Sequence, residues 1–565
     1  MNILGICNAN NSGAALIVDG KIIAIANEER FSRKKFTREF PVNAIDYVLK
    51  EGSLRLEDID YLGCGAWNGI DTFETLPQFI DDISSKSLEN SFTKQHVFNR
   101  FHSTLESDSN AKKLLVEGCM NYGINPDEII YCDHHYSHAL TAFYPSEYED
   151  AVVLVADGRG DFRSISIWSA SRENGLQCLH SVSELNSLGA MYSYITKLLG
   201  FIPDRHEGKV TGLAAHGKPH HLLEEFLSAI TFNPENGGVD TNYGDFYLPY
   251  INADLKALEK LKDKVSNSDF AFAAQIILED VLCKYLSFQL NKFFNNKKIN
   301  LCLSGGCFAN VKLNFELYKL KQVEKIYISP EMGDGGNAFG GAINCMIRFS
   351  EKKYLQMPNV YLGPSYNEKR ILEYCNQHKL NASQPTNLLD LIAEKLKNSE
   401  IIGWFTGRME YGPRALGARS ILASPTDSSI NTSLNKRLNR TEFMPFAPVT
   451  TDKLARLCFK DWKPTDVASR FMTTCYECTE FMNEKCPATV HIDNTARPQV
   501  VRREDNERYY DLITKFYELT GIPALINTSF NNHEEPIVCT PGDAMSSYLI
   551  GNVDLLVIDK FLITK

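Results

Sequence analysis

The sequence has little of what would take a chain to a membrane or to nucleic acid. It has no apolar run of about 18 residues, the length that spans a bilayer. Its first residues, MNILGICNANNSG, carry neither a basic stretch nor a long apolar one, so no secretory signal is expected. Its 59 basic residues are outnumbered by 70 acidic ones, giving a net charge of −11, which argues against a general nucleic-acid surface. We therefore expect a cytoplasmic protein with neither a membrane nor a nucleic-acid partner.

A disulfide framework is also absent. The 15 cysteines are spread thinly over 565 residues, in odd number and without framework spacing, which favours reduced thiols in a cytosol. Cys475 and Cys478, with Cys486 nearby, have metal-ligand spacing, but a structural zinc site needs four ligands and no second pair follows at a usable distance. Buried free thiols are the favoured interpretation. The length exceeds one ordinary core, so two or three domains are expected.

Two stretches far apart in the sequence share one pattern: a strand, a polar loop containing glycine, and a second strand. The first covers 3–26, with its loop at 8–13 and a hairpin turn at Asp19-Gly20, which is a strong two-residue turn signal. The second joins an apolar run at 151–156 to a strand near 165–168, through the residues Asp157-Gly158-Arg159-Gly160-Asp161. This repeated plan resembles that of the phosphate loops in the acetate kinase, sugar kinase, Hsp70 and actin superfamily.

Two further glycine-rich turns follow in the middle of the chain. A predicted helix at 271–294 and a strand at 299–303 lead into Ser304-Gly305-Gly306, and a strand at 325–329 leads into Gly333-Asp334-Gly335-Gly336. A Gly-Gly turn between a strand and a helix lets backbone N–H groups surround an anion. After scattered polar residues and prolines at 350–395, a second unit begins at the apolar strand 401–405.

The densest histidine cluster is the run DHHYSH at 133–138. In a helix, His134 and His138 share one face at roughly 5–6 Å, which suits two imidazole ligands on one ion, whereas His135 points elsewhere. Carboxylates must complete such a site, and Asp157 and Asp334, each in a glycine-containing loop, are the candidates. A mixed imidazole and carboxylate set fits iron, manganese or zinc. The alternative, two histidines that merely line a helix, is disfavoured by these two aspartates.

Eleven motifs in a fixed order extend this interpretation. They are EERFSRKK at 28–35, HxxxH at 134–138, DGxG at 157–160, EGKVTGLA at 207–214, SGG at 304–306, GDGG at 333–336, GPRALG at 412–417, RSI at 419–421, PFAP at 445–448, NTARPQ at 494–499 and NTSFN at 527–531. Each alone is moderate evidence, but their order and separation are very specific. Over nearly its whole length, the chain resembles the O-carbamoyltransferases typified by the nodulation-protein, cephamycin and tobramycin carbamoyltransferases.

The resemblance implies an α/β protein whose first domain, at 1–355, is actin/Hsp70/sugar-kinase-like, similar to the tRNA threonylcarbamoyl transferases, and holds the metal. A connector at 356–395 would lead to a C-terminal α+β unit at 396–565 that resembles YrdC. In the family, that unit joins carbamoyl phosphate to ATP, releasing pyrophosphate and forming carbamoyl adenylate. The first domain then transfers the carbamoyl group to a substrate hydroxyl. Iron(II) is the expected metal, Mg²⁺ accompanies ATP, and a homodimer is plausible by resemblance.

Site residues are carried over on matching motif positions. Carbamoyl phosphate, ATP and pyrophosphate are polyanions, and arginine binds phosphate in bidentate fashion. The candidates for adenylate formation are Lys35, Arg414, Arg419, Arg440, Arg497, Asn527 and Ser529. The proposed metal ligands are His134, His138, Asp157 and Asp334, and the residues assigned to the nucleotide are Asn10, Gly158, Lys209, Gly305, Gly306, Asn310 and Gly335. Lys209 is also a candidate for the acceptor pocket. A neutral hydroxyl needs a general base, for which His135 and Asp161 are the candidates.

The chain departs from the family pattern in two places. The first loop reads Ala9-Asn10-Asn11 where the family has a histidine, and Asn439 stands where many members have a lysine. These departures motivate one alternative, a weakened paralogue that only binds nucleotide. A tRNA threonylcarbamoyl transferase is another, against which the acidic charge and the C-terminal unit argue. A plain sugar kinase would not explain the histidine pair or the arginine motifs. The expected acceptor is a polar small molecule with a free hydroxyl, such as a sugar or a natural product.

Overall fold

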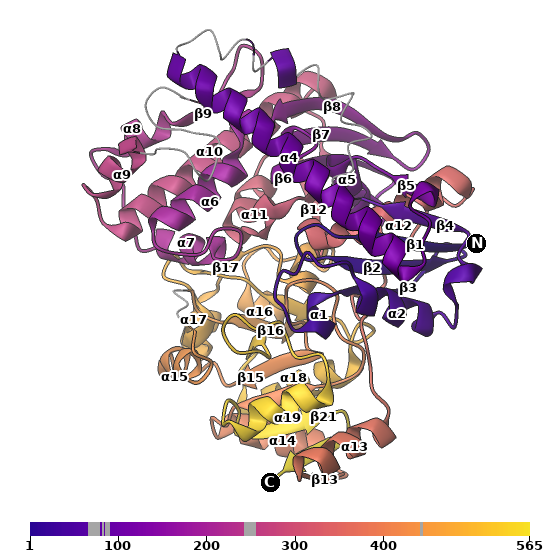
Figure 1. The fold of residues 1–565 in the computed structure, drawn as a ribbon. Coiled ribbons are helices and arrows are strands. Elements are labelled where there is room, and N and C mark those ends of the chain that lie inside the picture. Colours follow the sequence, from indigo (N-terminus) through magenta and orange to yellow (C-terminus); the bar gives the residue numbers. More distant parts are fainter. Residues whose placement is uncertain (66–78, 82–83, 85–90, 242–255, 441–443) are drawn as a thin grey trace. The chain divides into compact units, whose positions relative to one another are not determined.

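The computed structural model describes all residues except 66–78, 82–83, 85–90, 242–255 and 441–443. The chain forms two compact units (Figure 1): the first holds Met1–Ile23 and Arg38–Gln356, and the second holds Ala24–Thr37 and Met357–Lys565. The early segment Ala24–Thr37 therefore groups with the C-terminal half, as does the stretch from 357 to 395 that the sequence suggested as a connector. Among the described helices, none has both the length and the apolar character that a bilayer span requires.

Two five-stranded sheets of the first half of the chain have the same topology. One has the order β3-β2-β1-β4-β5 and the other β12-β11-β6-β7-β8. Their strands are β1 (Asn2–Cys7), β2 (Gly13–Val18), β3 (Lys21–Asn27), β4 (Tyr61–Cys64), β5 (Ile129–Tyr131), β6 (Asp150–Gly160), β7 (Arg163–Ser171), β8 (Gly175–Ser183), β11 (Ile299–Ser304) and β12 (Val323–Ile328). Each central strand, β1 or β6, has an antiparallel neighbour on one side and parallel strands on the other. This duplication confirms the predicted actin/Hsp70/sugar-kinase-like fold.

Two helices pack between these sheets. Helix α12 (Asn337–Phe349) contacts β1, β2 and β4, and it also contacts α5 (His134–Phe143), which in turn packs on β6 and β11. Small residues allow the close approach: a Cβ on Gly5 would collide with the Ala338 carbonyl oxygen, and one on Gly340 with Ser137 Oγ. Because α5 is sandwiched in this way, its histidines are fixed at the ends of β6 and β11.

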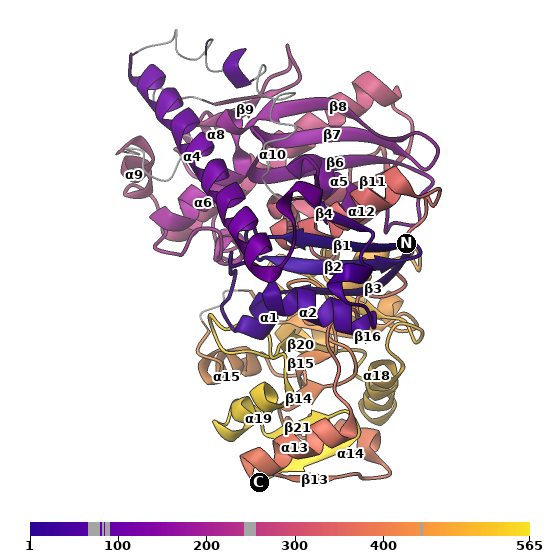
Figure 2. The same cartoon turned by 45° about the vertical axis from the view of Figure 1, so that its right-hand side comes forward.

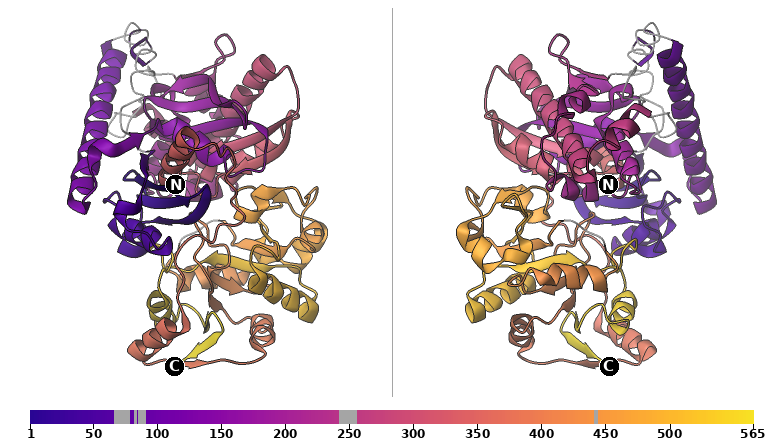
Figure 3. Two further views of the ribbon diagram at one scale, coloured as in Figure 1. Left: turned by 90° about the vertical axis from the view of Figure 1, so that its right-hand side faces the viewer. Right: turned by 90° about the vertical axis from the view of Figure 1, so that its left-hand side faces the viewer.

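The other helices of the first unit surround these layers. The long helix α4 (Ser91–Tyr122), the violet helix at the edge of Figure 3, precedes β5. The remaining elements are α2 (Val42–Glu51), α6 (Leu188–Leu198), α7 (Glu207–Ala214), α8 (Leu223–Leu227), β9 (Ile230–Phe232), β10 (Val239–Thr241), α9 (Lys256–Lys262), α10 (Asn267–Phe294) and α11 (Val311–Tyr318). Helix α10 contacts α6, α7 and α11. It therefore helps to hold α7, which carries the EGKVTGLA motif, in place.

The second unit is built on a mixed eight-stranded sheet of order β13-β22-β21-β14-β15-β20-β16-β19. Its strands are β13 (Asn381–Ser383), β14 (Ile402–Phe405), β15 (Arg419–Ala423), β16 (Ala447–Thr451), β19 (Gln499–Val501), β20 (Leu525–Ser529), β21 (Leu555–Ile558) and β22 (Phe561–Thr564). Smaller elements of this unit are α1 (Glu29–Ser32), α15 (Ser429–Arg437), α16 (Ala455–Cys458), β17 (Tyr476–Glu477), α17 (Glu480–Lys485) and β18 (Thr495–Ala496). The α+β architecture predicted for this unit is confirmed, and its likeness to YrdC stays a prediction.

Helices cover both faces of that sheet (Figure 2). Helices α13 (Glu368–His378) and α19 (Pro541–Leu549) pack on one face with Phe405 and Ile421, whereas α14 (Leu388–Lys397) and α18 (Glu507–Thr520) pack on the other with Trp404 and Leu422. Neighbouring strand residues point to opposite faces, so β14 and β15 each feed both cores. Helices α13 and α14 thus belong to the folded unit because their apolar sides complete its two cores.

The cysteines form no disulfide. All of them are free thiols, and Cys475, Cys478 and Cys486 are buried, with Cys478 and Cys486 in the apolar cluster around α16 and α17.

Candidate functional site

Helix α5 presents the histidine pair from its first turns. Its N-cap is Asp133, whose Oδ1 accepts a hydrogen bond from the Tyr136 N–H at 2.7 Å, and Asp161 Oδ2 accepts one from the His134 N–H at 2.7 Å. Carboxylates are favoured at a helix N-terminus because they bind its free N–H groups and oppose its partial positive charge. The two aspartates therefore fix where α5 begins, and His134 and His138 follow on one face, as predicted.

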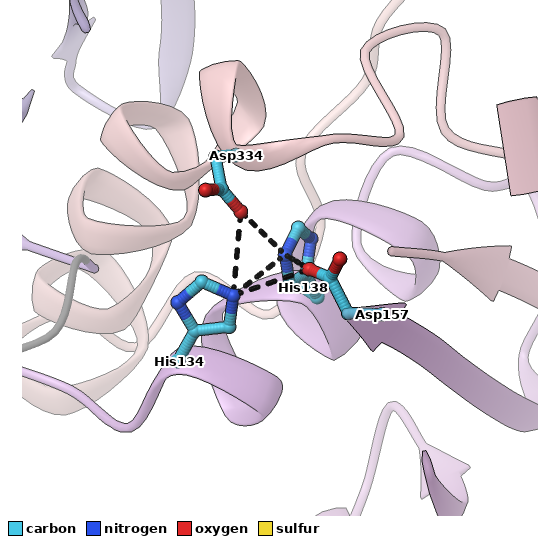
Figure 4. Close-up of side chains that lie close together, drawn as sticks. All are labelled: His134, His138, Asp157 and Asp334. Carbon is cyan, nitrogen blue, oxygen red and sulfur yellow. Dashed lines mark hydrogen bonds and ion pairs between the residues drawn. The ribbon is translucent and has the colours of Figure 1, made fainter. Parts of the chain in front are cut away.

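Four side chains converge on one point of the first unit (Figure 4). The Nε2 atoms of His134 and His138 are 3.2 Å apart. His134 Nε2 lies 3.3 Å from Asp157 Oδ2 and 3.4 Å from Asp334 Oδ1, and His138 Nε2 lies 3.1 Å and 3.6 Å from the same two oxygens. Asp157 lies where the pairing of β6 with β7 changes register, and Asp334 opens the turn Asp334–Gly336. The structure thus brings together the four residues that the sequence predicted as metal ligands.

The separations of these atoms fit a single bound cation. Divalent metals bind imidazole nitrogen and carboxylate oxygen at about 2.0–2.2 Å, so neighbouring ligand atoms on one ion lie roughly 2.8–3.6 Å apart. The five measured separations run from 3.1 to 3.6 Å. Two nitrogens and two carboxylate oxygens suit iron, manganese or zinc better than a metal that prefers thiolate or oxygen alone.

A second layer of hydrogen bonds orients His138. Its Nδ1 lies 3.1 Å from Ser304 Oγ, and that hydroxyl donates to the Met332 carbonyl oxygen at 3.2 Å. Because the hydroxyl proton goes to the carbonyl, Nδ1–H is the donor in the first contact, and the lone pair of Nε2 faces the four-residue centre. Ser304 was not assigned a role from the sequence, although it opens the SGG motif.

The charges of this centre call for a cation. Burial lowers the pKa of His134, but the carboxylates of Asp157 and Asp334 outweigh burial and hold that pKa well above its ordinary value. Burial raises the pKa of both aspartates, and here the two imidazoles outweigh it, so both carboxyl pKa values lie below the ordinary range. Two buried carboxylates are stable only beside positive charge, which a divalent metal supplies more fully than one imidazolium.

The two predicted general-base candidates lie in the interior. His135 is fully buried, and its Nδ1 lies 2.9 Å from Ser166 Oγ on β7. Burial, helped by the charge of His134, lowers the pKa of His135 well below its ordinary value. Asp161 is 2% exposed and is engaged by the His134 N–H; burial and the neighbouring Asp133 raise its pKa to about 7. Neither side chain is open to a substrate hydroxyl, so the structure does not support either as the base.

The glycine turn after β11 requires its glycines. Gly305 has a φ of +105°, and a Cβ there would collide with the Ala156 carbonyl oxygen. A Cβ on Gly306 would lie 3.0 Å from Asp157 Oδ1, whereas the Cβ position of Gly158 has open space around it. The missing side chains leave the backbone of both loops close to the ligand Asp157, which is the position expected of nucleotide-binding loops.

Asn310 has a supporting position. Its Oδ1 caps α11 by accepting from the Leu313 N–H at 3.1 Å. Its Nδ2 donates to Thr211 Oγ1 at 3.2 Å and to Gln275 Oε1 at 2.8 Å. Asn310 therefore ties the SGG turn to helices α7 and α10, and its predicted contact with nucleotide stays a prediction.

The other residues assigned to nucleotide have varied surroundings. Asn10 Oδ1 accepts from Arg38 Nε at 2.5 Å. Lys209 is buried on α7, with its Nζ 5.8 Å from the centre of the Phe201 ring. Gly335 is buried in the turn that Asp334 opens. Their assignment to nucleotide stays a prediction.

In the second unit, Arg440 organises the turn after β20. Its Nη1 donates to Thr528 Oγ1 at 2.8 Å, and its Nη2 donates to Ser529 O at 2.8 Å and to Asn531 O at 2.9 Å. Lys35 belongs to the same region: burial lowers its pKa, Glu534 opposes that shift, and the charge of Arg440 adds to it. Lys35 therefore lies near Glu534 and Arg440 within this unit, and its role in adenylate formation stays a prediction.

Asn527 joins three of the motifs. It is 1% exposed, and its Nδ2 donates to Ala415 O at 3.1 Å and to Gln499 Oε1 at 2.7 Å. Gln499 Nε2 in turn donates to Leu416 O at 2.8 Å. Asn527 Oδ1 is buried without a hydrogen-bond partner among the described residues, as a ligand-binding group would be. The sequence pointed to Gln499 only as the last letter of a motif.

Arg414 and Arg497 are half-buried, and each is close in sequence to a member of this network. The turn that carries Arg414 is held by Glu410, whose Oε1 accepts from the N–H groups of Leu416, Ala418 and Arg419 at 2.6, 3.3 and 3.2 Å. Their predicted contact with phosphate stays a prediction.

The surroundings of Arg419 do not fit its predicted role. It was predicted to bind phosphate, but it is fully buried with its guanidinium carbon 3.6 Å from the centre of the Phe405 ring. Its Nη1 donates to the carbonyls of Thr406, Gly407 and Ala418, and its Nη2 donates to Pro364 O at 2.9 Å. Because the guanidinium is fully buried and donates to four carbonyls, Arg419 stabilises the chain around β14 and β15.

The duplicated sheets and the two-histidine, two-aspartate centre define an α/β enzyme of the actin/Hsp70/sugar-kinase-like class. The carbamoyltransferase N-terminus family model matches residues 2–343, and the carbamoyltransferase C-terminus model matches residues 393–565. The chain therefore belongs to the carbamoyltransferase family, and it is a transferase that moves a carbamoyl group to an acceptor.

Relatives extend over most of the chain. An uncharacterized protein of Synechocystis is 31% identical, covering 100% of this chain and 97% of that protein. Nodulation protein NolNO of Sinorhizobium fredii is 30% identical over 98% of this chain and 79% of its own length. Nodulation protein U of Rhizobium tropici is 24% identical over 100% of this chain and 96% of its own length. The solved structure of T. kodakarensis HypF has a TM-score of only 0.31 at 12% identity, over 63% of this chain and 49% of that chain, so the fold rests on the sheet topology.

Proposed function

We propose that this chain is an ATP-dependent O-carbamoyltransferase that forms carbamoyl adenylate and transfers its carbamoyl group to a hydroxyl of a small molecule, such as a sugar or a natural product. The observation that carries the proposal is the convergence of His134, His138, Asp157 and Asp334 beside the Gly305 turn. A centre that combines a cation site with an anion-binding turn suits an adenylate phosphate.

The first half-reaction is assigned to the second unit. Lys35, Arg414, Arg440 and Arg497 supply positive charge for the polyanions, and the orphaned Asn527 Oδ1 is a hydrogen-bond acceptor suited to the carbamoyl NH₂. Carbamoyl adenylate keeps the carbamoyl group and the AMP phosphate. Atom balance then requires that pyrophosphate leaves from ATP and, with one water consumed, that phosphate leaves from carbamoyl phosphate.

The second half-reaction is assigned to the first unit. A divalent metal held by His134, His138, Asp157 and Asp334, for which iron(II) is proposed, would supply Lewis-acid stabilisation of the adenylate phosphate. The N–H groups of the Gly305 turn bind phosphate oxygen. Ser304 keeps His138 in the correct tautomer, and the N-cap aspartates of α5 keep both imidazoles in place.

The test is pyrophosphate release from ATP with and without carbamoyl phosphate, using protein loaded with iron(II) and no acceptor. We expect release that depends on carbamoyl phosphate, and its loss in Arg414→Ala. Arg503→Ala is the matched control, because Arg503 is 55% exposed and only pairs with surface acids. Folded, metal-loaded protein that releases no pyrophosphate, both alone and with a panel of hydroxyl compounds, would count against the proposal.

A further inference from the structure

Helix α4 carries charged side chains to the loop that holds Asp157. Asp108 Oδ1 lies 3.0 Å from Nη1 of Arg159, which is two residues beyond Asp157. About two turns earlier on the same helix, Arg100 Nε lies 3.0 Å from Oε1 of the buried Glu184. The helix also contacts the first loop, because Asn8 Nδ2 donates to the Ala111 carbonyl oxygen at 3.0 Å. The middle of α4 therefore lies against both of the loops assigned to the adenylate.

The carboxylates around His134 differ in their availability. Asp157 and Asp334 face its Nε2, and Asp161 accepts from its backbone N–H. Asp133 is bound to the Tyr136 N–H, and the side chain of Glu184 is 0% exposed. Asp108 is different, because its side chain is 18% exposed while it still pairs with Arg159. Of the carboxylates named here, Asp108 alone combines solvent access with freedom from ligand and capping duties.

The surroundings of Asp108 favour proton abstraction. Burial raises the pKa of its carboxyl, Arg159 opposes that shift, Glu184 adds to it, and the charge of His134 also opposes it. Arg159, two residues beyond Asp157, connects this carboxylate to the loop of the four-residue centre. A base with a raised pKa removes a proton more readily, and Arg159 favours the ionised carboxylate and orients it.

We propose that Asp108 is the general base that takes the proton from the acceptor hydroxyl during carbamoyl transfer. The hydroxyl oxygen forms a bond to the carbamoyl carbon, the bond from that carbon to the AMP phosphate oxygen breaks, and AMP leaves with the electron pair. Asp108 receives the hydroxyl proton and later releases it to water. This role rests on the proposed function. It replaces the predicted base candidates His135 and Asp161, which are both buried.

The experiment separates the two half-reactions in Asp108→Asn. Carbamoyl-phosphate-dependent exchange of labelled pyrophosphate into ATP reports adenylate formation, and AMP release in molar glycerol reports attack by glycerol and water together. We expect exchange and bound metal within twofold of the unaltered protein, and AMP release lowered about 10²-fold, the usual contribution of a general base. The acid limb of the pH profile of AMP release should vanish. Glu117→Gln is the control, because Glu117 lies on the same helix with 53% exposure.

Each outcome decides a different point. Absence of exchange in the unaltered protein would overturn the proposed function and this role with it. Exchange in both proteins, with AMP release in Asp108→Asn within twofold of normal or with its acid limb retained, would overturn the role of Asp108 alone. If Asp108→Asn loses metal or exchange, Asp108→Ala measured with and without added formate decides: AMP release raised at least tenfold by formate, with exchange unaffected by it, supports the base, and release that formate does not change overturns it.

Discussion

Two arginines that were predicted to bind phosphate, Arg419 and Arg440, have different surroundings in this protein. The guanidinium of Arg419 donates hydrogen bonds to backbone carbonyls inside the second unit, whereas that of Arg440 holds the turn that carries Ser529. Both guanidinium groups donate to backbone carbonyls, but Arg419 is fully buried whereas Arg440 is half-buried. Burial depends on packing, and it decides which arginine remains open to a ligand.

Replacing Arg440 with lysine tests its structural use. Lys has no planar fork, so Arg440→Lys leaves carbonyls of Ser529 and Asn531 without a donor, and we expect a loss of about 1–2 kcal/mol in the free energy of unfolding. Urea denaturation measures it. Arg437→Lys is the control, because the Arg437–Asp554 pair is about a third exposed and such pairs contribute little. Equal shifts in the two variants would show that Arg440 does not hold the turn.

The metal site was predictable residue by residue, because helical spacing and glycine-framed aspartates are local signals. His134, His138, Asp157 and Asp334 do converge. The base candidates were not predictable in this way. His135 and Asp161 look available in the sequence, but burial is set by how β7 and α5 pack, which no local pattern records. Asp108 has no motif around it, and only the packing of α4 brings it to Arg159.

At the scale of elements, the strands were predicted best. The hairpin at Asp19-Gly20, the strands before each glycine turn and helix α10 all lie where the apolar patterns indicated. The segment from 357 to 397 was harder, because prolines and polar residues obscure α13 and α14, whose apolar sides have meaning only against the eight-stranded sheet. The assignment of Ala24–Thr37 to the second unit depends on contacts distant in sequence, including Arg30 Nη2 to Gly412 O at 2.9 Å.

Helix α7 has a pH-dependent first residue. Burial raises the pKa of Glu207 from 4.5 to about 7, so the folded state holds its proton more tightly than the unfolded chain. The stability from this proton is fully present below pH of about 4.5 and is lost as the pH rises through about 7. Glu207→Gln cannot ionise and keeps the acceptor for the Asp204 N–H.

We therefore expect Glu207→Gln to be more stable than the unaltered protein at pH 8, by on the order of 1 kcal/mol, and equal to it at pH 4.5. Thermal unfolding at the two pH values measures the difference. Glu225→Gln, on an exposed residue of α8, should show no such pH dependence. A constant difference between Glu207→Gln and the unaltered protein at both pH values would contradict the raised pKa.

At the scale of the whole molecule, the two units contain different functional groups. The first has the imidazole and carboxylate centre, and the second has Lys35 near Arg440 and, separately, the orphaned Asn527 Oδ1. If each unit performs one half-reaction, the two activities must be separable by treatments that act on only one of them. Removing the metal is such a treatment, because its four ligands all belong to the first unit.

We expect protein stripped with a chelator, and then returned to Mg²⁺, to keep carbamoyl-phosphate-dependent pyrophosphate exchange while AMP release falls at least tenfold. Iron(II) should restore release, with manganese(II) and zinc(II) tested beside it. Asp334→Asn should weaken metal binding at least tenfold in titration calorimetry, because it removes a carboxylate charge from the centre, whereas Asp280→Asn, on a 44% exposed residue, should not. A metal that stabilises charge only during transfer must affect AMP release alone. Loss of pyrophosphate exchange together with AMP release would therefore place the metal in the first half-reaction. Undiminished AMP release from the stripped protein would show that the metal takes no part in the chemistry.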